Sequence, residues 1–485
     1  MAESGGARAL ANPPDRTTER TVLIALLLLT WALGLLLLDA KSLWLDEAYG
    51  LYVTRLGLPV LWAGQSEPYH PPLFYWLLER WLLLGDGEFL WRFPSVCFTV
   101  LSVLAAHRLA YAWFGRAVAL TAALLMALSP VLIWYAQELR PYALLVLLSL
   151  VTTAAVTRLC LRPGSLPFLI AAGAITAAIY LHYFALLLLG VHLITFVALL
   201  AARRTTPWAL FSLVAAWAVA LAAWWPWTQS PAFGSFVRLL TDSGNYVAVL
   251  FTQRLHISPS VLGAAPIWLG LGAAVGLALL AVLYRLLRMM HERGAWARLR
   301  RSRVLPYVAG ACFALLLFYF VVPRAYTAKR QLLLLVPYLL IAFAWCWPWG
   351  RHRRLLGIVA ALSLALALVN VVLVPKNQWR EAAAYIAAHA QPDDLVLLTP
   401  RYMTAPYDLY APANLARAGL PFAFDTAALG ALEAGHERIW VVSDPFDADP
   451  AGHLQQWLSE RGELVDTATF YRLNVELYEM EPAPD

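Results

Sequence analysis

The sequence predicts a polytopic α-helical membrane protein with about eleven transmembrane helices, followed by a small C-terminal extracytoplasmic α/β domain. Two observations carry this prediction. The 485-residue chain is 61% hydrophobic and only 14% charged, whereas a soluble domain carries about a quarter charged residues. Apolar stretches of about 18 or more residues, long enough to cross a bilayer core of about 30 Å, recur along it.

The apolar segments define the predicted spans. The first lacks a small-residue cleavage site, which favours an uncleaved span over a signal peptide. The spans are residues 21–38, 90–107, 117–135, 141–157, 166–182, 183–201, 207–227, 261–284, 304–322, 331–349 and 355–374.

Basic residues predict the orientation. With the N-terminal tail, residues 1–20, in the cytoplasm, every short loop assigned to that side contains arginine, as the positive-inside rule requires. An odd number of spans then places the C-terminus outside a plasma or inner membrane. The net charge of +6 therefore reports topology, and no nucleic-acid partner is expected. Lysine occurs only at Lys41, Lys329 and Lys376, which we attribute to genome composition.

Composition divides the rest of the chain into a membrane domain, residues 21–375, and a soluble domain, residues 376–485. In the soluble domain, WREAAAYIAAHA and AGHLQQWLSERG predict helices, while DLVLLTP, RIWVVSDP and ELVDTATFYRLNVELYEME predict strands. Alternating strands and helices are typical of an α/β domain. It contains no GxGxxG or P-loop, so no nucleotide site is expected.

The first outer loop, residues 39–89, predicts two helices lying at the membrane interface. One starts near Asp46. The other, PLFYWLLERWLLLG, follows Pro71, which suits a helix N-terminus. At about a dozen residues it is too short to span the membrane.

Paired acids give the strongest candidate site. Asp46 and Glu47 lie between apolar and aromatic residues just beyond the first span. Ionisable groups at a membrane boundary are costly to desolvate and indicate function. The alternative is that Asp46 caps the following helix, and both roles are compatible.

A second group, Glu67, His70 and Tyr75, surrounds the consecutive prolines that begin the interfacial helix. His70 has three alternatives: it binds a metal with Glu67, orients a substrate hydroxyl, or hydrogen-bonds to the loop. No spacing here is specific for a metal. A divalent metal therefore stays an open alternative, and no cofactor is assigned.

Two further outer turns carry polar residues. The first contains Gln137, Glu138, Arg140 and Tyr142, and the second contains His182 and Tyr183. Glu138 and Arg140 either contribute to a site shared with Asp46 or pair with each other. A lone histidine at a helix end, such as His182, is more often a packing residue.

The segment 323–331 places Arg324, Lys329 and Arg330, with Tyr326, on the outer side, where the positive-inside rule disfavours cations. Such cations indicate an anionic partner such as a lipid phosphate. The alternative is general binding to anionic membrane lipids.

In their order and loops, WLDEAY, HPPLFYWLL, WRFPS and SPVLIWYAQELRPYALL resemble the glycosyltransferase family 39 proteins of the GT-C superfamily. These are relatives of protein O-mannosyltransferases and lipid A aminoarabinose transferases. The resemblance covers about residues 20–200, and KRQLLLLVPYLLIAFA and the start of the soluble domain are also similar. The chain lacks the beta-trefoil insertion of eukaryotic protein mannosyltransferases. The class of acceptor, whether protein, lipid or glycan, therefore stays open.

The resemblance implies a hexosyl- or pentosyltransferase that moves a sugar from polyprenyl phosphate with inversion at the outer membrane face. It implies that Asp46 deprotonates the acceptor and that Glu47 shapes the site. We further expect His70 to support the site, and the leaving phosphate to be bound by cations, for which the candidates are Arg324, Lys329, Arg330 and Arg140. The alternatives are a transporter or flippase of lipid-linked sugars, or an inactive binding relative. A transporter would place ionisable residues near the bilayer midplane, whereas here they lie in outer loops.

Overall fold

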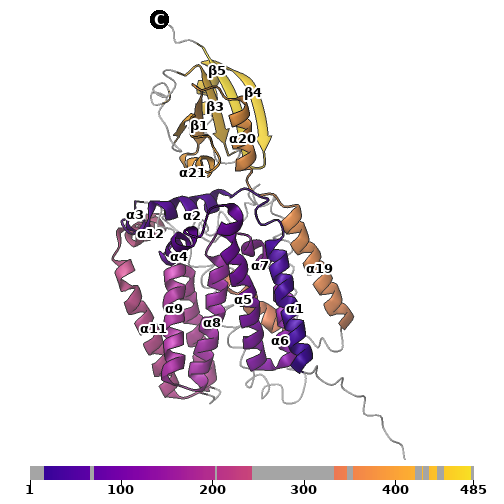
Figure 1. The fold of residues 1–485 in the computed structure, drawn as a ribbon. Helices are drawn as coiled ribbons and strands as arrows, with labels where there is room; N and C mark the ends of the chain where they lie inside the picture. Colours follow the sequence, from indigo (N-terminus) through magenta and orange to yellow (C-terminus); the bar gives the residue numbers. More distant parts are fainter. Residues whose placement is uncertain are drawn as a thin grey trace, which may run out of the picture.

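The computed structural model describes residues 16–65, 70–201, 205–242, 333–346, 353–420, 429, 436–444 and 453–481. Within these residues an α-helical bundle is joined to a C-terminal α/β domain (Figure 1).

Among the described residues, five helices of the bundle are long and apolar enough to cross a membrane. They are α1 (Arg16–Leu35), α5 (Glu88–Phe114), α8 (Tyr142–Leu161), α11 (Pro207–Thr228) and α19 (Arg353–Val372). Shorter apolar helices are α9 (Ser165–Leu181), α10 (Leu187–Ala201) and α18 (Val336–Cys346). The chain is thus a multi-pass membrane protein. The predicted spans 261–284 and 304–322 lie outside the described residues, so the count of about eleven stays a prediction.

The predicted span 117–135 is two helices, α6 (Arg116–Ala127) and α7 (Pro130–Ala136), which are bent by 57°. Pro130 has no backbone N–H to continue α6, but it suits the first turn of α7. The hydroxyl of Ser129 caps α7 by accepting the N–H of Leu132. The turn that follows α7, residues 137–141, contacts the outer loop through hydrogen bonds to Asp46 and Glu47.

Where the structure describes it, the loop between α1 and α5 contains three short helices: α2 (Leu45–Leu56), α3 (Leu58–Trp62) and α4 (Leu73–Leu82). Gly57, with φ of 86°, separates α2 from α3, a backbone angle that favours glycine. These helices and α12 (Pro231–Asp242) lie at the end of the bundle that meets the C-terminal domain (Figure 1).

A proline fixes α4 against α5. Pro94 lies inside α5 and cannot donate to the carbonyl of Leu90, four residues earlier. The indole N–H of Trp81 in α4 donates to that carbonyl at 2.7 Å. The interfacial helix is thereby attached to a membrane-spanning helix.

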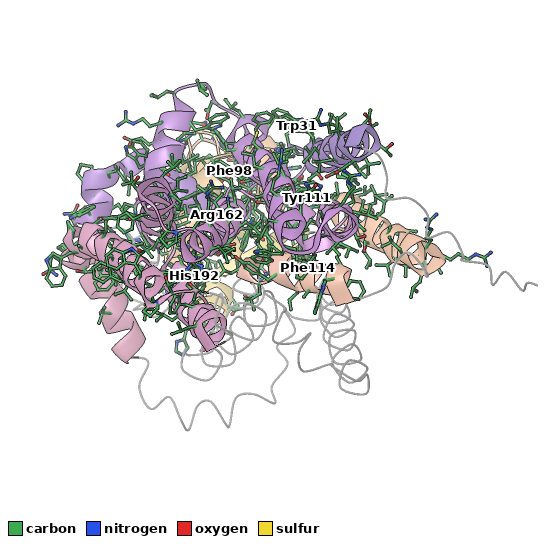
Figure 2. All side chains as sticks on the ribbon, turned by 90° about the horizontal axis from the view of Figure 1, so that it is seen from below. Trp31, Phe98, Tyr111, Phe114, Arg162 and His192 are labelled. Carbon is green, nitrogen blue, oxygen red and sulfur yellow. The ribbon has the colours of Figure 1, made fainter. Side chains whose placement is uncertain are left out.

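Apolar packing holds the bundle together. One cluster joins α8, α9, α10 and α11, and another joins α1, α5, α6, α8 and α18. Figure 2, seen from the end opposite the C-terminal domain, shows that most side-chain atoms on these helices are carbon.

In the described part of the C-terminal domain, the strands form a five-stranded sheet with the order β2-β1-β3-β5-β4. The first three strands in that order are parallel, and β5 pairs antiparallel with β3 and β4. Alternate residues of β1 and β3 pack against α20 and α23 in two separate clusters, because strand side chains alternate between faces. The elements are α20 (Trp379–His389), β1 (Leu395–Thr399), α21 (Thr404–Asp408), β2 (Ala416–Gly419), β3 (Arg438–Ser443), α23 (His453–Ser459), β4 (Gly462–Phe470) and β5 (Leu473–Met480).

Candidate active site

Glu47 lies at the centre of a buried ionic cluster where α2, α5, α7 and the C-terminal domain meet. Its side chain is fully buried. One carboxylate oxygen accepts bonds from Arg92 Nε at 2.8 Å and the Leu139 amide at 2.7 Å. The other accepts bonds from Arg92 Nη2 at 2.8 Å, Lys376 Nζ at 3.0 Å and the Trp44 amide at 3.3 Å.

Arg92 binds the segment of residues 38–47 through its guanidinium group. A guanidinium has five N–H donors. Three of them bond to the carbonyls of Leu38, Lys41 and Ser42, at 2.9, 2.8 and 3.1 Å, and two bond to Glu47. Every donor is therefore used, which lets a buried cation be tolerated.

These partners keep Glu47 ionised. Burial raises the pKa of the carboxyl, but Arg92, Lys376 and the hydrogen bonds outweigh burial and hold the pKa at about 2. A carboxylate with that pKa and five donors is a poor proton acceptor at neutral pH. The contacts of Glu47 therefore suit it to holding its neighbours in place, and its role in a reaction stays a prediction.

Asp46 is the second residue of α2 and is partly exposed. The N-cap position belongs to Trp44, and Glu47 accepts the Trp44 N–H. Arg140 Nη1 donates to the Asp46 carbonyl at 2.9 Å, and Arg140 Nη2 lies 2.7 Å from His70 Nε2. Because arginine only donates, His70 Nε2 must accept and carry no proton.

Aromatic rings surround Arg140. Its guanidinium carbon lies 5.8 Å from the ring centre of Tyr142. The ring of His182 lies 4.8 Å from that of His70 and 5.8 Å from that of Tyr142. Tyr75 is buried, and burial raises the pKa of its hydroxyl to about 12. The charge of Arg140 lowers this pKa and the charge of Asp46 raises it. Tyr75 is therefore neutral and available as a hydrogen-bond donor.

Three predicted site residues have contacts that fix the fold. Gln137 Nε2 donates to the carbonyls of Leu33, Gly34 and Leu36 at the end of α1. The Glu138 carboxylate accepts from the Trp134 indole at 2.8 Å, and the Tyr183 hydroxyl accepts from the Trp227 indole at 3.2 Å.

The remaining predicted residues, Glu67, Arg324, Tyr326, Lys329 and Arg330, lie outside the described residues. In the described part of the chain, no group of three His, Cys, Asp or Glu side chains could hold a metal ion. The pairing of His70 with Glu67 as a metal site stays a prediction.

Two central residues, Arg92 and Lys376, were not among the predicted site residues. Arg92 stands in the WRFPS motif near the end of an apolar span, where a charge indicates a functional or structural role. Lys376 is one of the three lysines in the sequence. Lys41 and Lys376 lie 5.6 and 5.7 Å from the Trp134 ring centre, so two of these lysines belong to one cluster.

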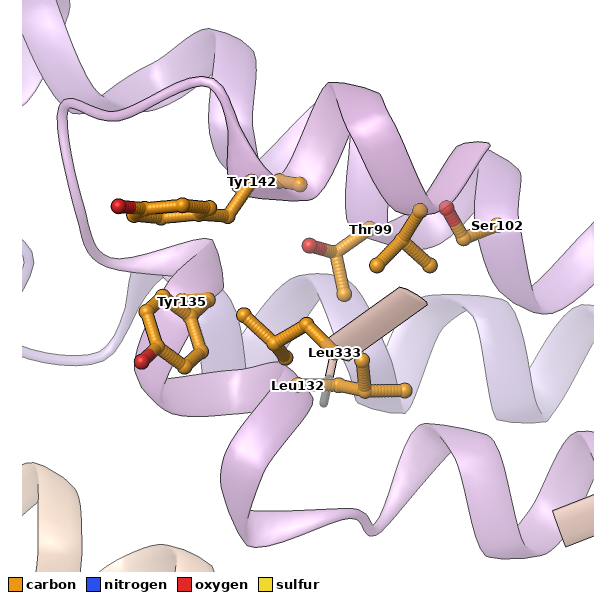
Figure 3. A pocket seen from close by; sticks show the side chains of 8 residues that line it. Thr99, Ser102, Leu132, Tyr135, Tyr142 and Leu333 are labelled. Atoms are coloured by element: carbon orange, nitrogen blue, oxygen red, sulfur yellow. The ribbon is translucent and has the colours of Figure 1, made fainter. Parts of the chain in front are cut away.

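A small cavity of about 10 Å³ lies inside the bundle, and Tyr142 is one of the residues that line it (Figure 3). Its lining includes Tyr135, Thr99, Ser102 and Leu333. This volume holds about one water molecule and excludes a sugar, so a donor substrate cannot bind there.

Residues 69–228 match the sequence profile of the dolichyl-phosphate-mannose-protein mannosyltransferases. No curated protein matches the chain by sequence.

Two solved structures have similar folds. One is ArnT from Cupriavidus metallidurans bound to undecaprenyl phosphate, with a TM-score of 0.61 and 14% identity over 96% of this chain and 98% of that one. The other is the oligosaccharyltransferase AglB from Archaeoglobus fulgidus, in complex with an inhibitory peptide and a dolichol-phosphate. Its TM-score is 0.53, with 13% identity over 96% of this chain and 74% of that one. The resemblance predicted from the motifs is thus confirmed, and the chain has the fold of the GT-C glycosyltransferases.

Proposed function

We propose that this protein is an inverting glycosyltransferase, which moves a sugar from a polyprenyl-phosphate carrier to an acceptor hydroxyl at the outer membrane face. The observation that carries the proposal is the position of Arg140. Its guanidinium bonds to the main chain of Asp46 and to His70. The backbone of Asp46, a cation and a neutral imidazole therefore lie together at one end of the helical bundle.

In the proposed reaction, the Asp46 carboxylate accepts the acceptor's hydroxyl proton as the acceptor oxygen attacks the anomeric carbon. The bond between that carbon and the phosphate oxygen breaks, and polyprenyl phosphate leaves with the bonding electrons. A single displacement inverts the anomeric configuration. A positioned base of this kind contributes about 10²–10⁴-fold to the rate.

The leaving phosphate needs cations in place before charge develops on it. Arg140 is held in place by its two partners and supplies one such charge. We assign the others to Arg324, Lys329 and Arg330, from the sequence. In support, solved relatives of the same fold hold undecaprenyl phosphate and a dolichol-phosphate.

The outer location is supported by the fold. The candidate site, α2–α4 and the C-terminal domain all lie at one end of the bundle (Figure 1). Arg116, at the other end, pairs with Glu19 next to the N-terminal tail. Arginine near that tail is expected on the cytoplasmic side.

The test uses purified protein in proteoliposomes with a panel of polyprenyl-phosphate hexoses and pentoses, together with cell-envelope extract as acceptor. The transferase predicts release of free polyprenyl phosphate and an inverted glycosidic product. Movement of intact sugar-lipid across the bilayer without carrier release would overturn the transferase and establish the flippase.

A further inference from the structure

We propose that the C-terminal domain positions Asp46 for the reaction by clamping the loop of residues 39–47. This inference rests on the proposed function, because it assumes that Asp46 performs chemistry. Three sets of contacts join the domain to this loop.

The first contact enters the buried ionic cluster. Lys376 lies between α19 and α20, at the junction of the membrane and C-terminal domains. Its ammonium donates to Glu47 and to the Gln137 carbonyl, both at 3.0 Å. The start of the C-terminal domain is therefore bonded to the residue that follows Asp46 and to the turn that carries Arg140.

The second contact is a single tyrosine hydroxyl. Tyr410 lies just after α21, and its hydroxyl accepts the Leu43 amide at 2.8 Å. The same hydroxyl donates to the Glu88 carboxylate at the start of α5. Tyr410 thus fixes a backbone amide three residues before Asp46 and bonds it to a membrane-spanning helix.

The third set involves the first turn of α20. Ser42 donates to Glu381 at 3.0 Å, and the Arg380 amide lies 3.4 Å from the Ser42 hydroxyl. The Arg380 side chain pairs with Glu88 and donates to the Asp39 carbonyl at 3.1 Å.

Apolar packing completes this contact. Leu409, next to Tyr410, packs against a buried cluster that includes Leu43, Ala48 and Leu51. Ala48 and Leu51 belong to α2, so the domain also contacts the helix that begins beside Asp46.

Together these contacts fix the loop from two sides. Arg92 of α5 holds the carbonyls of the loop, and the C-terminal domain holds its Leu43 amide and the Ser42 hydroxyl. Loop residues without regular structure have many accessible conformations, and each is excluded only by such contacts. A misplacement of about 1 Å in a reacting group is enough to cost about 10²-fold in rate. The domain is therefore a positioning element for Asp46.

The experiment compares Tyr410→Phe with Tyr407→Phe. Tyr407 belongs to α21, and its buried hydroxyl has no hydrogen-bond partner among the described residues. Each variant loses one phenolic hydroxyl, and the two residues are three positions apart in the chain. Only Tyr410→Phe leaves the Leu43 amide without its acceptor. Ser42→Ala, which removes the bond to Glu381, serves as a second test.

Two readouts are measured on the full chain in nanodiscs. In Tyr410→Phe, hydrogen exchange of the Leu43 amide should be about ten-fold faster, the size expected for one lost hydrogen bond. The kcat for carrier release should fall about ten-fold while the donor KM stays unchanged, because binding is separate from the placement of Asp46. Ser42→Ala should change both in the same direction, and Tyr407→Phe should change neither.

Unchanged exchange in Tyr410→Phe would overturn the clamp whether or not the protein transfers sugar. Faster exchange with unchanged kcat would overturn the positioning role. If the wild-type protein releases no carrier, the proposed function fails, and the exchange readout alone still decides whether the domain restrains the loop.

Discussion

Replacement of Glu47 by glutamine tests whether the buried ionic cluster holds the site together. Glutamine has the same shape but offers one acceptor oxygen and an NH₂ group where the carboxylate offers two acceptors. In either orientation the NH₂ faces N–H donors of Arg92, together with the Leu139 amide or the Lys376 ammonium. Two cations then remain buried without their counter-charge.

The size of the effect follows from two independent considerations. Removing one partner of a buried ion pair costs about 3–5 kcal/mol. A carboxyl whose pKa is held at about 2 instead of 4.5 contributes about 3 kcal/mol to folding at neutral pH. Because the folded-state pKa is lowered, that stability is present above about pH 4.5 and is lost as the pH falls towards about 2.

The assay is unfolding in mixed micelles by titration with SDS, followed by tryptophan fluorescence. Glu47→Gln should lower the free energy of unfolding by about 3–5 kcal/mol. The control is Glu79→Gln, an exposed pair with Arg80 at 3.9 Å, which should cost less than about 1 kcal/mol. Adding Lys376→Met to Glu47→Gln removes one stranded cation, so the double variant should lose less than the sum of the single losses. A Glu47→Gln protein within about 1 kcal/mol of wild type would refute the ionic cluster as a major stabilising element.

Three further predictions concern neighbouring groups. Burial, Lys376 and Arg92 lower the pKa of Lys41 to about 8. Between about pH 8 and 10.5 the unfolded state therefore binds more protons than the folded state, and the free energy of unfolding should rise with pH. Lys41→Met should lack this rise in the SDS titration. Trp81→Phe leaves the Leu90 carbonyl without its donor and should cost about 1–3 kcal/mol in the same titration, whereas exposed Trp76→Phe should cost less than about 0.5 kcal/mol. Arg140→Lys cannot bridge Asp46 and His70 and should lower kcat for carrier release by about 10²-fold; an unchanged kcat would remove Arg140 from the site.

The sequence was most informative about local features. The residue patterns of segment 379–481 predict alternating strands and helices, and the structure has a helix or strand at each of these patterns. The strand β2 (Ala416–Gly419) has the sequence ARAG, which has no strand propensity. It is a strand because its backbone pairs with β1, a contact that local sequence does not encode.

The different environments of Asp46 and Glu47 could not be predicted from the sequence. As neighbours they appeared equivalent, and only tertiary structure separates them. Glu47 is fully buried, and its partner Lys376 is 329 positions away along the chain. A contact of that separation cannot be found from spacing in one sequence. The rarity of lysine, first attributed to genome composition, was the signal that could have identified Lys376.

Asp46 is proposed to accept the acceptor's proton, and its replacement by asparagine tests this role. Carrier release by wild type and Asp46→Asn is measured in single turnovers with the sugar-lipid donor found active, and binding of undecaprenyl phosphate is measured in parallel. Asp46→Asn should lower release by about 10²-fold or more, while undecaprenyl phosphate should bind as tightly as to wild type. Release at the wild-type rate by Asp46→Asn would show that another group accepts the proton.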